Sequence, residues 1–242
     1  MKIGILQTGR SPREVTEGRG DYDVLFKGLL AGRGYDFRTY AVLDGELPES
    51  LDEADGWLVT GSRFGVYEDH PWIPPLEEFL RRAHAARRPI VGVCFGHQIL
   101  AQALGGRVEK FQGGWSVGPV EYSFGERSLA LLAWHQDQVV ELPPGAQVLG
   151  QSDFCRYAFL QYGDTAFSCQ PHPEFTPDFF DALLSARRDV LPSEIAERAE
   201  HASAAAPALA SGALADKFAQ IFEAGVRDRQ AGSSQDANVP AD

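Results

Sequence analysis

Cysteine is scarce in this sequence, and long apolar runs are missing from it. The three cysteines, Cys94, Cys155 and Cys169, are odd in number and too few for a disulfide framework, so we expect a reducing compartment. No stretch of about 18 apolar residues is present, which argues against a membrane-spanning helix. The opening run MKIGILQTGR has neither a long apolar region nor a small-residue cleavage site, so no signal peptide is expected. These features predict a soluble, cytoplasmic protein with no membrane partner.

Positive charge is also in deficit. The chain has 22 Lys and Arg against 34 Asp and Glu, which gives a formal net charge of −12, and it has no long basic run. An excess of acid repels phosphate backbones, so nucleic acid is not expected as a partner. The phosphate-loop pattern GxxxxGK[ST] is absent as well, which argues against a P-loop nucleotide site.

The remaining composition is that of a globular protein, with 44% hydrophobic and 23% charged residues among 242. A chain of this length buries roughly 70–75% of its unfolded surface, which is enough for one α/β domain. Apolar runs alternate with helical periodicity over the first hundred residues, and this predicts a parallel sheet covered on both faces. The expected strands are residues 2–7, 37–43, 56–60 and 90–93, and the expected helices are residues 23–30 and a segment that follows the proline-rich turn at 71–75.

After residue 106 short strand candidates follow one another without helices between them, which indicates a small antiparallel excursion. We therefore predict an α/β three-layer sandwich with a central, mostly parallel sheet. The later candidates are strands at 117–122, 129–132, 138–142, 147–151 and 165–169, a helix at 175–187, and one or two surface helices in 194–224 interrupted by Pro207 and Gly212. The expected organisation is a single domain over 1–228, with a core over about 1–190, C-terminal helices over 191–228 and a disordered tail over 229–242.

The segment Gly92-Val93-Cys94-Phe95-Gly96 carries the strongest chemical signal. It joins an apolar strand to a helical pattern, and its small-x-nucleophile-x-small spacing is typical of a strand-to-helix elbow. Glycine is needed on both sides because larger side chains would collide with the tight turn. Such a turn places Cys94 at a helix N-terminus, which stabilises a thiolate, and aims the Phe95 N–H at an oxyanion beside the sulfur. The alternative, a buried structural cysteine, does not explain the paired glycines.

A thiolate needs a basic partner, and His172 is the best placed of the six histidines. It follows an apolar strand, and parallel strands bring their carboxyl ends to the edge where the elbow lies. Glu174, two residues later, can accept a hydrogen bond from the far ring nitrogen and fix the tautomer. His-Pro-Glu alone is more simply a turn, and its combination with the elbow favours a catalytic interpretation. Cys169 and His172 have metal-ligand spacing without a second pair, so no metal is expected.

Taken together, Gly92-Val93-Cys94-Phe95-Gly96-His97-Gln98 and His172-Pro173-Glu174 resemble the motifs of the class I glutamine amidotransferase domain. The resemblance covers about residues 1–190 and implies a flavodoxin-like parallel sheet flanked by helices. It implies that Cys94 is the nucleophile, His172 the general base and then acid, and Glu174 the orienting carboxylate. It further implies oxyanion donors at Ser62 and Phe95, and substrate contacts at Gly61, Gln98, Trp115, His135 and Gln136.

The sequence departs from the family at three points, and these bear on the substrate more than on the chemistry. Gly61-Ser62-Arg63 stands where synthetase-linked members have Gly-Gly-Pro, Pro171 replaces an aromatic residue, and His-Gln-Asp replaces His-Gly-Asp. The resemblance is to stand-alone members similar to guanylate-synthase glutaminase domains and to γ-glutamyl peptidases. It implies no cofactor and a small-molecule substrate, glutamine or a γ-glutamyl peptide.

Three functions stay open on the sequence alone. A glutaminase of the amidotransferase type would need a separate acceptor or synthetase subunit, since no pyrophosphatase loop is present in this chain. A γ-glutamyl peptidase acting on glutathione-like peptides would need no partner. A non-catalytic thiol sensor or a partner-gated binding subunit would use the reactive cysteine without His172 and Glu174.

Overall fold

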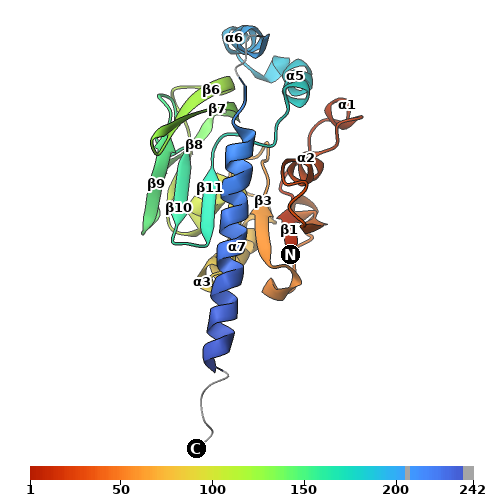
Figure 1. Cartoon of the computed structure of the whole chain (residues 1–242). Helices are drawn as coiled ribbons and strands as arrows, with labels where there is room; N and C mark the ends of the chain where they lie inside the picture. The colour runs from red at the N-terminus through yellow and green to blue at the C-terminus, as the bar shows by residue number, and fades with distance from the viewer. Residues whose placement is uncertain (205–207, 237–242) are drawn as a thin grey trace, which may run out of the picture.

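A large twisted sheet runs through the centre of the molecule, and helices pack against both of its faces (Figure 1). The computed structural model describes residues 1–204 and 208–236. The strands are β1 (Lys2–Leu6), β2 (Asp36–Tyr40), β3 (Gly56–Val59), β4 (Ile90–Val93), β5 (Arg107–Lys110), β6 (Ser116–Phe124), β7 (Arg127–His135), β8 (Asp137–Glu141), β9 (Ala146–Gln151), β10 (Phe159–Tyr162) and β11 (Ala166–Cys169). The helices are α1 (Arg13–Thr16), α2 (Tyr22–Leu29), α3 (Ile73–Ala85), α4 (Phe95–Ala103), α5 (Pro177–Ala186), α6 (Ser193–Ala204) and α7 (Ser211–Asp236), with short 3-10 turns η1 (Val42–Asp44), η2 (Leu51–Glu53) and η3 (Arg188–Val190).

The sheet has a parallel half and an antiparallel half. In the described residues its strand order is β2-β1-β3-β4-β11-β10-β9-β6-β7, and the first five strands are parallel. Their order follows the doubly wound pattern 2-1-3-4-5, which leaves a crevice at the carboxyl ends of the strands. The predicted α/β class is therefore confirmed, and the antiparallel strands continue the same sheet. β5 and β8 form a separate two-stranded ladder.

The outer strand β7 also reaches back to the centre of the molecule. The backbone N–H of His172, just after β11, donates to the carbonyl of Leu132 in β7 at 2.8 Å, as an isolated antiparallel bridge. β7 is the last strand in the sheet order and β11 is a central one. The antiparallel half therefore curls over the carboxyl edge of the parallel half and holds the segment that carries His172.

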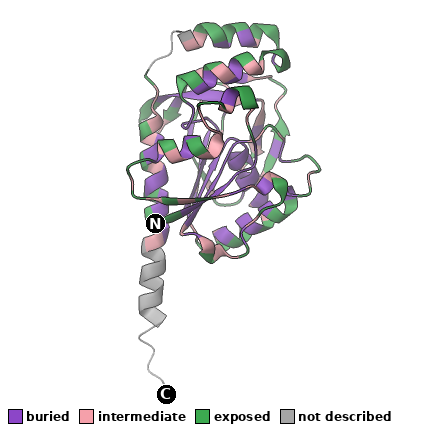
Figure 2. Ribbon diagram, turned by 90° about the vertical axis from the view of Figure 1, so that its right-hand side faces the viewer, coloured by how far each residue is buried: buried purple, intermediate pink, exposed green. Residues whose placement is uncertain are grey.

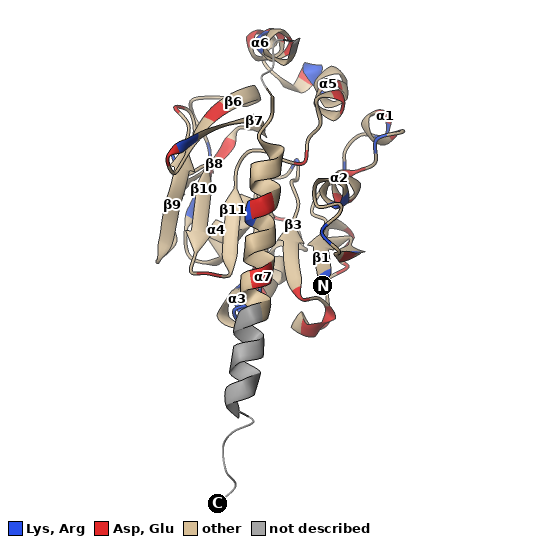
Figure 3. Cartoon of the chain, viewed as in Figure 1, with Lys and Arg blue, Asp and Glu red and all other residues tan. Residues whose placement is uncertain are grey.

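Apolar side chains fill the space on both sides of the sheet. On one face α3 and α4 bury Leu76, Leu80 and Leu100 against Trp57 of β3. α3 begins at Ile73, inside the segment predicted as a proline-rich turn, because proline fits the first turn of a helix. Its Arg81 and Arg82 are exposed. Figure 2 shows the buried strands between the helices, and Figure 3 shows that the central strands β3 and β11 carry no charged residue.

The opposite face is covered by α2 and α7. α7 is not the surface helix that its alanine-rich sequence predicts, because Leu214, Phe218 and Phe222 are fully buried against the sheet. These residues recur every fourth position, so they form one apolar stripe. A Cβ at Gly225 would lie 2.2 Å from Cγ of Pro89, so glycine allows close approach of α7 to the start of β4.

The C-terminal predictions have mixed outcomes. The predicted break at Gly212 is wrong, since this residue lies in the first turn of α7, while Pro207 lies outside the described residues. The predicted tail at 229–242 overlaps α7, which continues to Asp236. Once a helix is nucleated, each further residue adds a hydrogen bond, so the stretch RDRQA can extend it without an apolar stripe. Residues 237–242 lie outside the described residues. None of the described helices is both long and apolar enough to cross a bilayer.

Candidate active site

Cys94 lies in a sharp turn between β4 and α4. Its φ of 54° and ψ of −105° place it in a region that non-glycine residues rarely occupy. The flanking glycines make the turn feasible. A Cβ at Gly92 would lie 2.3 Å from the carbonyl oxygen of Gly96, and one at Gly96 would lie 2.3 Å from that of Val59. Only glycine fits at either position, so the structure has the elbow that the sequence pattern predicts.

Two backbone N–H groups belong to residues next to Cys94 in the chain or in space. Phe95 begins α4, and Ser62 lies in the loop after β3. Within the described part of the chain, no hydrogen-bond acceptor is found for the backbone N–H of either residue. The loop itself is fixed at Thr60, whose carbonyl accepts from the Gly96 N–H at 3.1 Å and from the hydroxyl of Thr8 at 2.9 Å. Two fixed, unpaired donors therefore lie beside Cys94.

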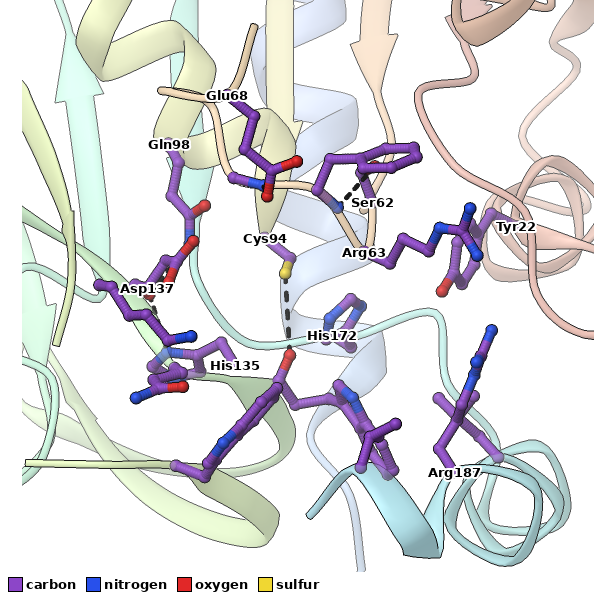
Figure 4. A pocket seen from close by; sticks show the side chains of 18 of the residues that line it. Tyr22, Ser62, Arg63, Glu68, Cys94, Gln98, His135, Asp137, His172 and Arg187 are labelled. Atoms are coloured by element: carbon purple, nitrogen blue, oxygen red, sulfur yellow. Dashed lines mark hydrogen bonds between the residues drawn. The ribbon is translucent and has the colours of Figure 1, made fainter. Parts of the chain in front are cut away.

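Three groups surround the side chain of His172. Its Nδ1 bonds to Oε1 of Glu174 at 2.6 Å, and both residues are only 3% exposed. The Phe175 ring stacks on the imidazole with centroids 4.0 Å apart. Gly61 lies on another side, since a Cβ there would be 3.0 Å from Cε1 of His172 and 3.7 Å from the Cβ of Cys94. With Nδ1 engaged by Glu174, Nε2 is the nitrogen available to the cysteine side (Figure 4).

The pKa of His172 is shifted upward, whereas those of His97 and His135 are shifted downward. Burial by itself lowers the pKa of His172, but the charges of Glu174 and of a Cys94 thiolate outweigh it and raise that pKa to about 10. Burial lowers the pKa of His135 to about 4 and that of His97 to about 3. His172 is therefore the imidazole that carries a proton at neutral pH when Cys94 is ionised, while the other two are neutral.

These groups open into a cavity of about 320 Å³ at the carboxyl edge of the parallel strands. Its walls bring together most of the residues predicted for the site. Those lining the cavity are Ser62, Cys94, Gln98, Trp115, His135, Gln136 and His172. Gly61, Phe95 and Glu174 do not line it: Gly61 and Phe95 flank Cys94, and Glu174 lies behind His172. The predicted site residues are therefore neighbours in space.

The wall near Gln98 is a network of polar groups. The Gln98 amide donates to the carbonyl of Asp137 and to Oε1 of Gln170, both at 3.0 Å. The same Asp137 carbonyl lies 3.2 Å from Nδ1 of His135, and Nε2 of His135 has no partner among the described residues. The hydroxyl of Tyr67 donates to the Asp137 carboxylate at 3.1 Å. These hydrogen bonds fix the side chains of Gln98, His135 and Asp137 beside the cavity.

Several lining residues were not predicted from the sequence. They are Arg10, Tyr22, Glu68, Lys110 and Arg187. Each comes from a different loop, strand end or helix end, so no local motif connects them. Arg63 and Asp137 also line the cavity; they lie in the segments predicted for the oxyanion loop and for substrate binding, but neither was singled out as a site residue. Within the described ranges, no three His, Cys, Asp or Glu side chains gather as metal ligands.

The fold and the cavity define a class of α/β proteins with a cysteine elbow at the carboxyl edge of a parallel sheet. The family model for class I glutamine amidotransferase matches residues 36–188, which is more than half of the chain. The chain therefore belongs to the class I glutamine amidotransferase family.

Individual relatives agree with this assignment. Gamma-glutamyl peptidase 4 of Arabidopsis thaliana is 31% identical over 182 residues, which cover 68% of this chain and 72% of that protein. GMP synthase [glutamine-hydrolyzing] of Pyrobaculum aerophilum is 29% identical over 157 residues, 60% of this chain and 30% of that protein. A solved glutamine amido transferase from Methylobacillus flagellatus superposes with a TM-score of 0.71 at 22% identity, covering 93% of this chain and 94% of that one, and shows a shared fold.

Proposed function

We propose that this protein is a cysteine-dependent amidohydrolase that cleaves the γ-amide bond of a glutamyl compound. Cys94 is the nucleophile, His172 transfers the proton, and Glu174 orients His172. The observation that carries the proposal is the 2.6 Å bond from Nδ1 of His172 to a buried Glu174, which leaves Nε2 for the cysteine side. The similarity to γ-glutamyl peptidases and to GMP synthase supports the same substrate bond.

The first half-reaction makes a thioester. The Cys94 thiolate adds to the γ-carbonyl carbon, and negative charge passes to the carbonyl oxygen. The N–H groups of Ser62 and Phe95 are the proposed donors to that oxyanion, and one such donor is worth about 3 kcal/mol. Nε2–H of His172 gives its proton to the amide nitrogen, the C–N bond breaks, and the amine leaves. A γ-glutamyl thioester and a neutral His172 remain.

The second half-reaction restores the enzyme. Neutral His172 takes a proton from a water molecule, and the resulting hydroxide adds to the thioester carbon. The C–S bond then breaks, and glutamate is released with the thiolate of Cys94 and the imidazolium of His172 regenerated. The raised pKa of His172, about 10 beside the charges of Glu174 and a Cys94 thiolate, supports its role as the proton donor to the leaving amine.

The glutamyl part is proposed to bind along the polar wall. Asp137 and Glu68 offer carboxylates to its α-ammonium group, and both line the cavity. The predicted substrate contacts are Gly61, Gln98, Trp115, His135 and Gln136. Gln98 is pre-oriented by its two hydrogen bonds, so it loses little rotamer freedom on binding. A transfer of the released ammonia to an acceptor on a separate subunit is compatible with this site, as is simple hydrolysis.

The test is to incubate the purified protein with glutamine and, separately, with glutathione, and to measure released glutamate and ammonia. Hydrolysis of either substrate that is lost in Cys94→Ser by about 10³-fold or more is the expected result. The same protein should react with iodoacetamide at Cys94, and His172→Ala should slow that reaction. A rate unchanged by His172→Ala, with no hydrolysis of either compound, would contradict the proposal and favour a thiol sensor.

A further inference from the structure

The cavity carries opposite charges on its two sides. Figure 4 shows Glu68 and Asp137 on the side of Gln98, and Arg63 and Arg187 on the other side, beyond His172. Cys94 lies between the two groups. The two sides therefore differ in the charge of the ligand group that they favour.

Two of the cationic side chains that line the cavity already face acidic groups. Arg10 is ion-paired with Asp44 through both of its terminal nitrogens. Lys110 lies close enough to Glu68 for the two charges to interact. These two cations are balanced by the protein itself, so they leave little positive charge for a ligand.

Arg63 and Arg187 have no such partner. Among the described side chains, those of residues 1–203 and 208–226, neither forms an ion pair with an acidic group within 4.0 Å. The guanidinium of Arg63 lies 4.8 Å from the centre of the Phe64 ring, and both residues line the cavity. Arg187 follows α5 and lines the same cavity. In a chain of net charge −12, two unpaired guanidinium groups in one cavity wall provide a site for an anion.

The position of His172 indicates which part of a substrate meets these arginines. Because His172 must give its proton to the departing nitrogen, the leaving group lies on the His172 side of Cys94. Arg63 and Arg187 lie on that side. We infer that Arg63 and Arg187 bind a carboxylate on the leaving amine, so that the preferred substrates are γ-glutamyl amino acids and peptides with a free carboxylate.

This inference rests on the proposed function and extends it to the leaving group. Guanidinium groups match carboxylates in shape and form charge-assisted hydrogen bonds, often two at once. Glutamine has no such group, because its leaving amine is ammonia. A hydrogen bond of this kind to a charged group corresponds to about a 10- to 100-fold preference. The pair Arg63 and Arg187 is called the carboxylate subsite below.

The catalytic experiment compares two substrates that differ at one group. γ-Glutamyl-alanine has a free carboxylate, and γ-glutamyl-alanine amide has none. We expect the wild-type kcat/KM to favour the acid by about 10- to 100-fold. Arg63→Gln and Arg187→Gln should each lower that ratio, and the double variant should bring it close to one. Arg188→Gln is the matched control, because Arg188 is the next residue, bonds to Glu200 at 2.9 Å and does not line the cavity.

A binding experiment separates the subsite from catalysis. Cys94→Ala cannot form the thioester, so calorimetric titration of this variant with both compounds measures affinity alone. The acid should bind more tightly by about the same factor, and the double arginine substitution should remove the difference. Tight, acid-selective binding with no wild-type hydrolysis would refute the proposed function and keep the subsite. Equal affinity or equal kcat/KM for acid and amide, or a ratio that survives the double substitution, would overturn the subsite.

Discussion

Gly61→Ala should impair the site while leaving the protein folded. Gly61 has no left-handed φ, so alanine is compatible with its backbone. The new methyl group would lie 3.0 Å from Cε1 of His172 and 3.7 Å from the Cβ of Cys94. Since ordinary carbon contacts begin near 3.5 Å, either the imidazole or the loop must move by a few tenths of an ångström.

His172 has little room to make that movement. It is bonded to Glu174 at 2.6 Å, stacked on Phe175 at 4.0 Å, and tied to the Leu132 carbonyl through its backbone N–H at 2.8 Å. The strain should therefore tilt the ring away from Cys94. A misplacement of about 1 Å in a catalytic group costs on the order of 100-fold in rate, and the shift here is smaller, so we expect a 10- to 100-fold loss of kcat/KM. Overpacking should lower the free energy of unfolding by about 1–2 kcal/mol.

The assays are kcat/KM for a γ-glutamyl peptide, the rate of Cys94 alkylation by iodoacetamide, and urea unfolding. Gly28→Ala is the control, because a Cβ there meets nothing within 4 Å and the position lies inside α2. This control should gain about 1 kcal/mol of stability from helix propensity and keep wild-type kinetics. If Gly61→Ala retains kcat/KM and alkylation within twofold of wild type, the contact between Gly61 and His172 does not position the imidazole.

Three further predictions concern charge and packing. Glu174→Gln removes a negative charge beside His172 and so lowers the pKa of His172 from about 10. The alkaline limb of the pH profile of kcat/KM should therefore move to lower pH. A limb that does not move would show that Glu174 does not determine the pKa of His172. Gly96→Ala would place a Cβ 2.3 Å from the Val59 carbonyl oxygen and should lower the free energy of unfolding, measured in urea, by about 3 kcal/mol. Little change in that free energy would mean that the elbow relaxes to accept the methyl group. Phe222→Ala, at a fully buried position of α7, should cost about 3–5 kcal/mol, whereas a loss below 1 kcal/mol would mean that α7 contributes little to the core.

The parts of the site that rest on short-range constraints could be predicted from the sequence. Gly92 and Gly96 flank Cys94 because backbone atoms approach within about 2.3 Å of where their side chains would begin, and that constraint leaves a fixed spacing in the chain. His172 and Glu174 are two residues apart, so their hydrogen bond is also local. Their convergence with Cys94 follows from the parallel order of β4 and β11.

The parts that depend on long-range packing could not be predicted. The arginines of the carboxylate subsite come from the loop after β3 and from the end of α5, and no spacing in the sequence relates them. Strands β5 and β10 were not predicted, and in β5 three of the four residues are charged, which hides the strand pattern. α7 was predicted to lie on the surface because its alanines suggested weak burial, although Phe218 and Phe222 are fully buried.

The bridge between Leu132 and His172 also determines how small a working unit of this protein can be. Cys94 belongs to the parallel half of the sheet, whereas the backbone of His172 is bonded to β7, the last strand of the antiparallel half. A fragment that ends after α4 would keep the elbow and lose the histidine together with the strand that holds it. A fragment that begins after α4 would keep His172 and lose Cys94. The smallest unit that retains both Cys94 and His172 in place therefore includes both halves of the sheet, and shortening is confined to the loops.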